Sequence, residues 1–189
     1  MIYDNDFYKQ EIRKHLGDAR YIHSLNVADS ALYLAKKYGE DTEKAYTAGL
    51  LHDILKEMPK TEMREYIMSH YELTVLEQLT PNVWHQIADA IFVKENYLED
   101  EDIINAIHYH TTGRAGMSKL EKIVYVADFI SAERNYPDVD IMRGEAEKSL
   151  EEAMLYSLKY TINKLLNLGC PIHPDTVAAY NEITSSERK

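Results

Sequence analysis

Apolar side chains recur at intervals of three and four residues along almost the whole chain, a spacing that places them on one face of an α-helix. The clearest example comprises Tyr21, Leu25, Ala28, Leu32 and Ala35. Gly17 precedes this stretch, and Gly39 follows it where a C-terminal helix cap is expected. The pattern therefore predicts a helix between these two glycines.

The same spacing predicts helices along the rest of the chain. The sequence Ser118 to Glu121 has the form of a capping box and precedes an apolar stretch, which indicates a helix start. The remaining predicted helices cover about residues 42–55, 61–69, 81–93, 100–109, 144–168 and 174 onward. No segment of useful length alternates apolar and polar residues as a β-strand does.

We therefore expect an all-α protein with a single domain of the orthogonal-array type, containing about eight or nine helices. Its core is expected at about residues 18–135, with the C-terminal helices of residues 144–186 packed on it. An exposed apolar stripe on the helix of residues 144–168 could support a homodimer.

Composition limits the function classes. Of 189 residues, 45% are hydrophobic, which is enough for a substantial core. The net charge of −11 disfavours binding to nucleic acid or to an anionic membrane. An anionic small-molecule substrate would need local positive charge, supplied by a metal ion or by placed arginine and lysine side chains.

The single cysteine, Cys170, excludes an intramolecular disulfide and a cysteine-based zinc site. The acidic N-terminus lacks the basic and apolar regions of a signal peptide. No apolar stretch is long enough to span a bilayer. These features predict a cytoplasmic protein.

Ionisable residues stand where the helical pattern predicts core. Asp128 follows four apolar residues, the pair His52 and Asp53 lies in a similar stretch, and His23 and His85 have apolar neighbours. Any one of them alone is more simply explained as a hydrogen-bonded core residue. Several in separate apolar helices instead indicate a metal centre, because unpaired buried polar groups are costly.

The ligand types narrow the choice of metal. Imidazole and carboxylate groups suit iron, manganese, zinc or nickel, and no thiolate selects a softer ion. Successive residues on a helix point about 100° apart. His52 and Asp53 can therefore share one ion only if the helix end faces the site, and Asp53 could also reach a second ion.

In the order and spacing of these residues, the chain resembles the HD-domain metallophosphohydrolases, whose signature is H…HD…D. His23, the pair His52 and Asp53, and Asp128 match that signature. Within this superfamily the chain resembles the bacterial symmetrical bis(5′-nucleosyl)-tetraphosphatases. The similar blocks are residues 20–28, 49–56, 109–114, 125–128 and 171–176. One departure is His108, which makes it ambiguous whether His108 or His110 faces the site, although the match of residues 109–113 favours His110.

The resemblance implies iron, as one or two ions, bound by His23, His52, Asp53 and Asp128. It implies that His85 and His110 complete a second metal position or contact phosphates. The substrate would be diadenosine tetraphosphate, cleaved at its centre to two ADP. The residues implied to bind it are Arg20, His23, Asp53, Ile54, Leu55, Lys56, His85, His110, Thr111, Asp128, Arg134, Pro171, Ile172, His173, Pro174, Asp175 and Thr176.

We expect Asp53, His52 and Lys56 to carry the catalysis. Lys56 lies one predicted turn beyond His52 and could reach the same site, although a solvated lysine at a helix end explains it equally well. Another hydrolase of the same fold, such as a nucleotidase, a guanosine alarmone hydrolase or a cyclic-nucleotide phosphodiesterase, stays open. So does a non-catalytic regulator that binds nucleotide.

Overall fold

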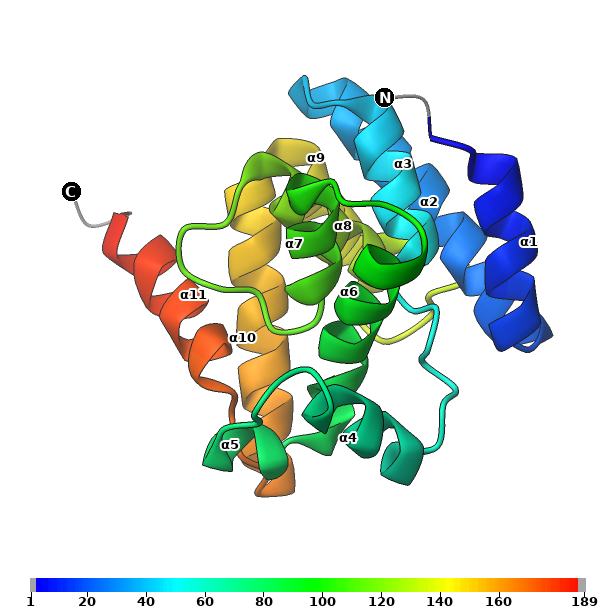
Figure 1. The fold of residues 1–189 in the computed structure, drawn as a ribbon. Coiled ribbons are helices and arrows are strands. Elements are labelled where there is room, and N and C mark those ends of the chain that lie inside the picture. Colours follow the sequence, from blue (N-terminus) through cyan, green and yellow to red (C-terminus); the bar gives the residue numbers. More distant parts are fainter. Residues whose placement is uncertain (1–2, 187–189) are drawn as a thin grey trace.

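The computed structural model describes residues 3–186, and within that range the protein consists of α-helices, one short 3-10 helix and connecting loops (Figure 1). The expected all-α architecture is confirmed. The helices are α1 Asn5–His15, α2 Asp18–Tyr38, α3 Thr42–Leu51, α4 Lys60–Met68, α5 Val75–Gln78, η1 Pro81–Val83, α6 Trp84–Asn96, α7 Glu101–His108, α8 Lys119–Ile130, α9 Val139–Lys148, α10 Leu150–Leu168 and α11 Pro174–Ser186.

Side-chain and glycine caps set many of the helix ends. Asp41 and Asp100 each accept hydrogen bonds from two backbone amides in the first turn of the following helix. Ser118 forms the predicted capping box at the start of α8. Gly39 and Gly169 adopt the left-handed conformation at the ends of α2 and α10, as the sequence predicts.

Two predicted helices differ from the observed ones. The helix expected over residues 42–55 ends at Leu51, and residues 52–57 form turns. The long helix expected over residues 144–168 is two helices, because Ser149 has an extended backbone and caps α10 through Glu152 N–H. This break, together with the short helix α5, brings the number of helices in residues 3–186 above the predicted eight or nine.

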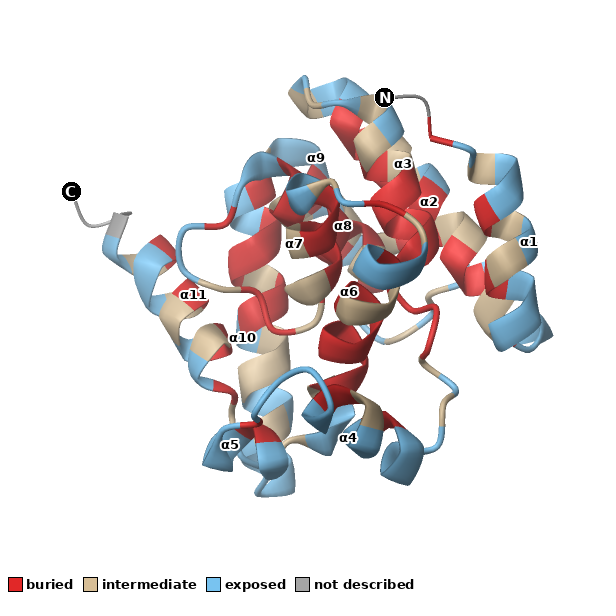
Figure 2. Ribbon diagram, in the orientation of Figure 1, coloured by how far each residue is buried: buried red, intermediate tan, exposed pale blue. Residues whose placement is uncertain are grey.

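The buried apolar side chains form one cluster, to which every α-helix in the described part of the chain except α5 contributes. Figure 2 shows the buried residues on the inward faces of α3, α6, α8 and α10, with exposed residues on the outer faces of α1, α4 and α11. Gly49 brings α3 against α2, where a Cβ atom would lie 2.9 Å from Ala28 Cα. Within residues 3–186, no helix combines the length and apolar character needed to cross a bilayer.

Candidate metal centre

Four histidines from four helical segments turn toward one point inside the protein. His23 lies within α2, His52 caps the end of α3, His85 lies in the first turn of α6, and His110 follows α7. All four are at most 4% exposed. The expected end-on arrangement of His52 and Asp53 is therefore present, because α3 ends where these two residues meet the cluster.

The ring orientation of each histidine is fixed through its Nδ1 atom. Nδ1 of His52 lies 2.7 Å from Gly49 O, Nδ1 of His85 lies 3.1 Å from Asn82 O, and Nδ1 of His110 lies 2.7 Å from Ile107 O. A carbonyl oxygen can only accept, so each Nδ1 carries the proton and each neutral ring presents the lone pair of Nε2. In metal-binding histidines, the hydrogen bond that one ring nitrogen donates determines in this way that the other nitrogen binds the metal.

Asp53 lies at the centre of the four rings and is 1% exposed. Its Oδ2 atom is 3.5 Å from His52 Nε2 and 3.8 Å from His23 Nε2. Its Oδ1 atom is 3.4 Å from both His85 Nε2 and His110 Nε2. One carboxylate therefore faces two pairs of imidazoles, one with each oxygen.

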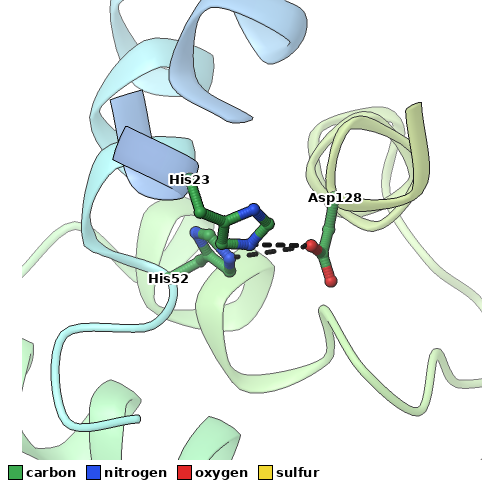
Figure 3. Close-up of side chains that lie close together, drawn as sticks. All are labelled: His23, His52 and Asp128. Atoms are coloured by element: carbon green, nitrogen blue, oxygen red, sulfur yellow. Dashed lines mark ion pairs between the residues drawn. The ribbon is translucent and has the colours of Figure 1, made fainter. Parts of the chain in front are cut away.

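Asp128 closes the side of the cluster that contains His23 and His52, as Figure 3 shows. Its Oδ1 atom lies 3.1 Å from His23 Nε2 and 4.0 Å from His52 Nε2. Arg134 pairs with the same carboxylate and also donates from Nε to the Asp128 carbonyl oxygen at 2.8 Å. These contacts place Asp128 on α8 opposite the imidazoles of α2 and α3.

The protonation states suit cation binding. Burial lowers the pKa of His52 to about 3. Burial and the charge of Lys56 hold the pKa of His85 well below its usual value. Burial would raise the pKa of Asp53, but the neighbouring His52 and Lys56 hold it well below the usual range. Neutral imidazoles and an ionised carboxylate are the forms that bind metal ions.

Asp128 and His23 influence each other's pKa. Burial would raise the pKa of Asp128, but His23 and Arg134 lower it well below its usual value. For His23, burial lowers the pKa, and the carboxylates of Asp128 and Glu133 outweigh that effect and raise it. A cation that binds His23 Nε2 would therefore displace a proton.

Several buried polar atoms lack the hydrogen bonds that burial ordinarily requires. Among the described residues, His23 Nε2, His52 Nε2 and Asp53 Oδ1 have no hydrogen-bond partner. His85 Nε2 and His110 Nε2 lie 3.1 Å apart although both rings carry their proton on Nδ1. A bound cation would satisfy these facing lone pairs, so the residues present fit a metal ion.

Three partly exposed cationic side chains surround the opening of the cluster. Arg20 donates to Asp53 Oδ2 at 2.9 Å, and Arg134 contacts Asp128. Lys56 Nζ lies 3.3 Å from Asp53 Oδ1. Their side chains are 30%, 34% and 29% exposed, respectively, so each can reach both the buried carboxylates and a ligand from solvent.

The structure shows which of the two neighbouring histidines, His108 or His110, faces the site. His110 is buried with its Nε2 atom in the cluster. His108 stacks on Tyr109, with ring centroids 4.5 Å apart, and burial lowers its pKa to about 4. Next to His110, the Thr111 hydroxyl lies 2.9 Å from His85 Nε2.

The other residues implied to bind nucleotide lie outside the cluster. Ile54 and Leu55 have side chains buried in the core, so only their backbones could meet a ligand. In the segment of residues 171–176, Thr176 donates to Thr112 O at 3.0 Å, which joins the start of α11 to the loop after α7. The two remaining histidines, His15 and His70, are exposed, and we assign them no role.

Two further carboxylates lie beside the expected ligands and were not predicted from the sequence. Asp89 is fully buried on α6, one turn beyond His85, and its Oδ1 accepts the Leu55 amide at 2.7 Å while Oδ2 has no partner. Its position four residues after His85, among apolar neighbours, was a usable signal. Glu133 pairs with His23 Nδ1 from the loop after α8, where no periodicity marks it.

Comparison with known proteins agrees with this geometry. The HD-domain family matches residues 20–133. The symmetrical bis(5′-nucleosyl)-tetraphosphatase of Bacillus subtilis is 40% identical over 92% of this chain and 94% of its own. The protein of the same name from Halalkalibacterium halodurans is 39% identical, covering 95% of this chain and 96% of its own.

A solved structure supports the same assignment. The crystal structure of a protein from Clostridium acetobutylicum, described as a predicted HD superfamily hydrolase involved in NAD metabolism, matches with a TM-score of 0.94 and 39% identity over the full length of both chains. The chain belongs to the HD-domain family of hydrolases and, within it, to the family of symmetrical bis(5′-nucleosyl)-tetraphosphatases.

Proposed function

We propose that this protein hydrolyses diadenosine tetraphosphate at the central phosphoanhydride bond and releases two ADP, with iron in the centre described above. The observation that carries the proposal is the convergence of four imidazole Nε2 atoms on the Asp53 carboxylate, with the Asp128 carboxylate beside His23. The names of relatives that match more than nine-tenths of the chain support the choice of substrate.

His23, His52, Asp53 and Asp128 would hold the metal ion, because their ligand atoms face one another on the side of Asp53 Oδ2. His85 and His110 would complete a second position on the side of Oδ1 or contact the phosphates. When bound, a metal ion lowers the pKa of water and neutralises charge on the attacked phosphoryl group.

The chain's own cations would orient the polyphosphate. Arg20, Lys56 and Arg134 stand at the opening, each beside a ligand carboxylate, so they are positioned before substrate arrives. Arginine side chains can bind phosphate oxygens in a bidentate manner, and a lysine provides a point charge. In a protein of net charge −11, these groups supply the local attraction that an anionic substrate requires.

One nucleoside would extend from the opening along Thr111 and the segment of residues 171–176. Thr111 lies beside His85, and the hydrogen bond from Thr176 to Thr112 O links this segment to the same loop. The backbone amides at the start of α11 could serve a phosphate or ribose oxygen.

Product analysis tests the proposal. Purified protein loaded with Fe²⁺ under anaerobic conditions is incubated with diadenosine tetraphosphate, and the products are separated by anion-exchange chromatography. ADP as the only product is expected, whereas ATP with AMP would mean asymmetric cleavage and would contradict the proposal. Asp53→Ala should lose bound metal and lower turnover by orders of magnitude while its circular dichroism spectrum remains helical.

A panel of competing substrates addresses the alternatives. Diadenosine triphosphate, ATP, guanosine alarmones and NAD test other hydrolase activities, and NAD is included because of the description of the Clostridium protein. Nucleotide binding without turnover of any of them, in metal-replete protein, would favour a regulator. Metal analysis of protein as purified, with manganese, zinc and nickel as the competitors, tests the assignment of iron.

A further inference from the structure

Glu133 differs from the other partners of the clustered histidines. The Nδ1 atoms of His52, His85 and His110 donate to backbone carbonyl oxygens, whereas His23 Nδ1 donates to the Glu133 carboxylate. A carboxylate partner withdraws the Nδ1 proton more strongly than a carbonyl does and so raises the basicity of Nε2. Of the four imidazoles, His23 is therefore the one whose Nε2 atom is made most basic by its Nδ1 partner.

The carboxylate is held in place by residues other than His23. Its Oε2 atom accepts from Asn26 Nδ2 at 2.7 Å, and Oε1 accepts from Ser131 Oγ at 2.7 Å. Asn26 lies three residues after His23 on α2, so both face Glu133 from one side of the helix.

The loop that carries Glu133 is fixed from α9. Arg143 donates to the carbonyl oxygens of Ile130, Ser131 and Arg134 at 3.1 to 3.2 Å. The loop therefore presents Glu133 to His23 and, next to it, Arg134 to Asp128. Two groups that contact expected metal ligands thus come from one short, well-supported segment.

We propose that Glu133 is a positioning residue for the metal centre: it fixes the Nδ1–H tautomer of His23 and strengthens Nε2 as a ligand. This inference rests on the proposed metal site. Glu133 does not itself reach the cluster, because its contacts are with His23 Nδ1, Asn26 and Ser131. A residue of this kind acts on metal affinity, whereas one that only joined the loop to α2 would act on stability alone.

Glu133→Gln separates these roles. Glutamine keeps the size and a neutral acceptor for His23 Nδ1, and the Asn26 amide can rotate to accept from it, but the negative charge is lost. Glu147→Gln is the matched control. Glu147 likewise contacts α2, in its case from α9, through Lys37 Nζ at 2.6 Å and the Tyr33 hydroxyl at 2.7 Å, and has no contact with a histidine.

The measurement is Co²⁺ binding to the full-length apoprotein, followed by its d–d absorption and by competition with a chromophoric chelator. We expect Glu133→Gln to raise the Kd for Co²⁺ about 10-fold and Glu133→Ala to raise it up to about 100-fold, with altered d–d bands. Glu147→Gln should bind as the wild type does. Circular dichroism and thermal unfolding of each variant show whether it is folded.

Equal Co²⁺ affinity and spectra in wild type and folded Glu133→Gln would overturn the inference and leave the metal centre intact. An equal loss of affinity in Glu147→Gln would also overturn it, because the loss would then follow from a weakened tether. Wild-type protein that binds no Co²⁺ would instead overturn the proposed metal centre, and this inference with it.

Discussion

The ammonium nitrogen of Lys56 lies 2.8 Å from Nε2 of His85. The same Nζ atom is 3.3 Å from Asp53 Oδ1, so the lysine stands between an imidazole and a carboxylate of the cluster. A protonated lysine can donate to the lone pair of His85 because Nδ1 of that ring already donates to Asn82 O. Lys56 therefore places a positively charged side chain on the Oδ1 side of Asp53, next to His85.

Lys56→Gln is expected to lower kcat for diadenosine tetraphosphate by roughly 10²–10³-fold, because a positioned charge that stabilises the transition state is lost. Metal bound by His23, His52, Asp128 and Oδ2 of Asp53 should be retained, since Lys56 contacts Asp53 through Oδ1. Steady-state kinetics and metal analysis of the variant provide the test. Lys122→Gln is the control, because Lys122 pairs with Glu151 on the surface. An unchanged kcat in Lys56→Gln would remove Lys56 from the catalytic group.

Gly49→Ala tests the close approach of the two helices that bring His23 and His52 together. The added Cβ would lie 2.9 Å from Ala28 Cα and 3.1 Å from Val27 O, and backbone atoms cannot give way as a flexible side chain can. We expect a loss of about 1–3 kcal/mol in the free energy of unfolding. Weaker Co²⁺ binding should accompany it as α2 and α3 separate. Chemical denaturation and Co²⁺ titration measure the two effects.

Gly144→Ala is the matched control for that substitution, because Gly144 also lies inside a helix and a Cβ there would meet nothing within 4 Å. Its stability should stay the same or rise by about 0.5–1 kcal/mol, since alanine favours a helix over glycine. A Gly49→Ala protein as stable as Gly144→Ala would show that α2 and α3 can accommodate a Cβ atom at Gly49, which contradicts the close approach to Ala28.

Asp89 gives a prediction about pH. Burial and the negative charge of Asp53 raise the pKa of Asp89 well above its usual value, so the folded protein holds a proton there that the unfolded chain releases. For such a group, stability is fully present below the unfolded pKa and falls as pH rises toward the folded pKa. Asp89→Asn removes this loss and keeps an acceptor for the Leu55 amide.

The metal-free Asp89→Asn protein should therefore have a higher urea midpoint than the wild type at pH 7.5. The difference should shrink as the pH is lowered toward the ordinary range of an aspartic acid. Paired urea titrations of the two apoproteins across this pH range check both statements. A variant that is less stable at pH 7.5, or a difference that is independent of pH, would show that Asp89 is ionised in the folded state.

The sequence predicted the helices with clear caps because those signals are local. Gly39, Gly169 and the Ser118 capping box mark helix ends through their own backbone and side-chain geometry. The break at Ser149 had a local signal as well, since Glu152 follows three residues later, but the continuous apolar spacing concealed it. The end of α3 at Leu51 had none: the Leu55 amide is bound by Asp89 from another helix.

That the buried ionisable residues would gather at one place could be predicted from the sequence, unlike the turn after α3. His23, His52, Asp53 and Asp128 interrupt apolar stretches, and burial of such groups demands a partner whatever the details of the fold. Glu133 lies in a polar loop, where a carboxylate is unremarkable in sequence, and only the packing of that loop against α2 brings it to His23. The choice of His110 over His108 at the cluster likewise depends on where α7 ends.

Anomalous X-ray scattering from crystals of iron-loaded protein, with data collected on both sides of the iron absorption edge, tests the central claim most directly. We predict an anomalous difference peak for iron about 2 Å from Nε2 of His23 and of His52 and from the carboxylate oxygens of Asp53 and Asp128. An iron peak at another place, or an iron-replete crystal in which these four side chains hold no ion, would contradict this prediction.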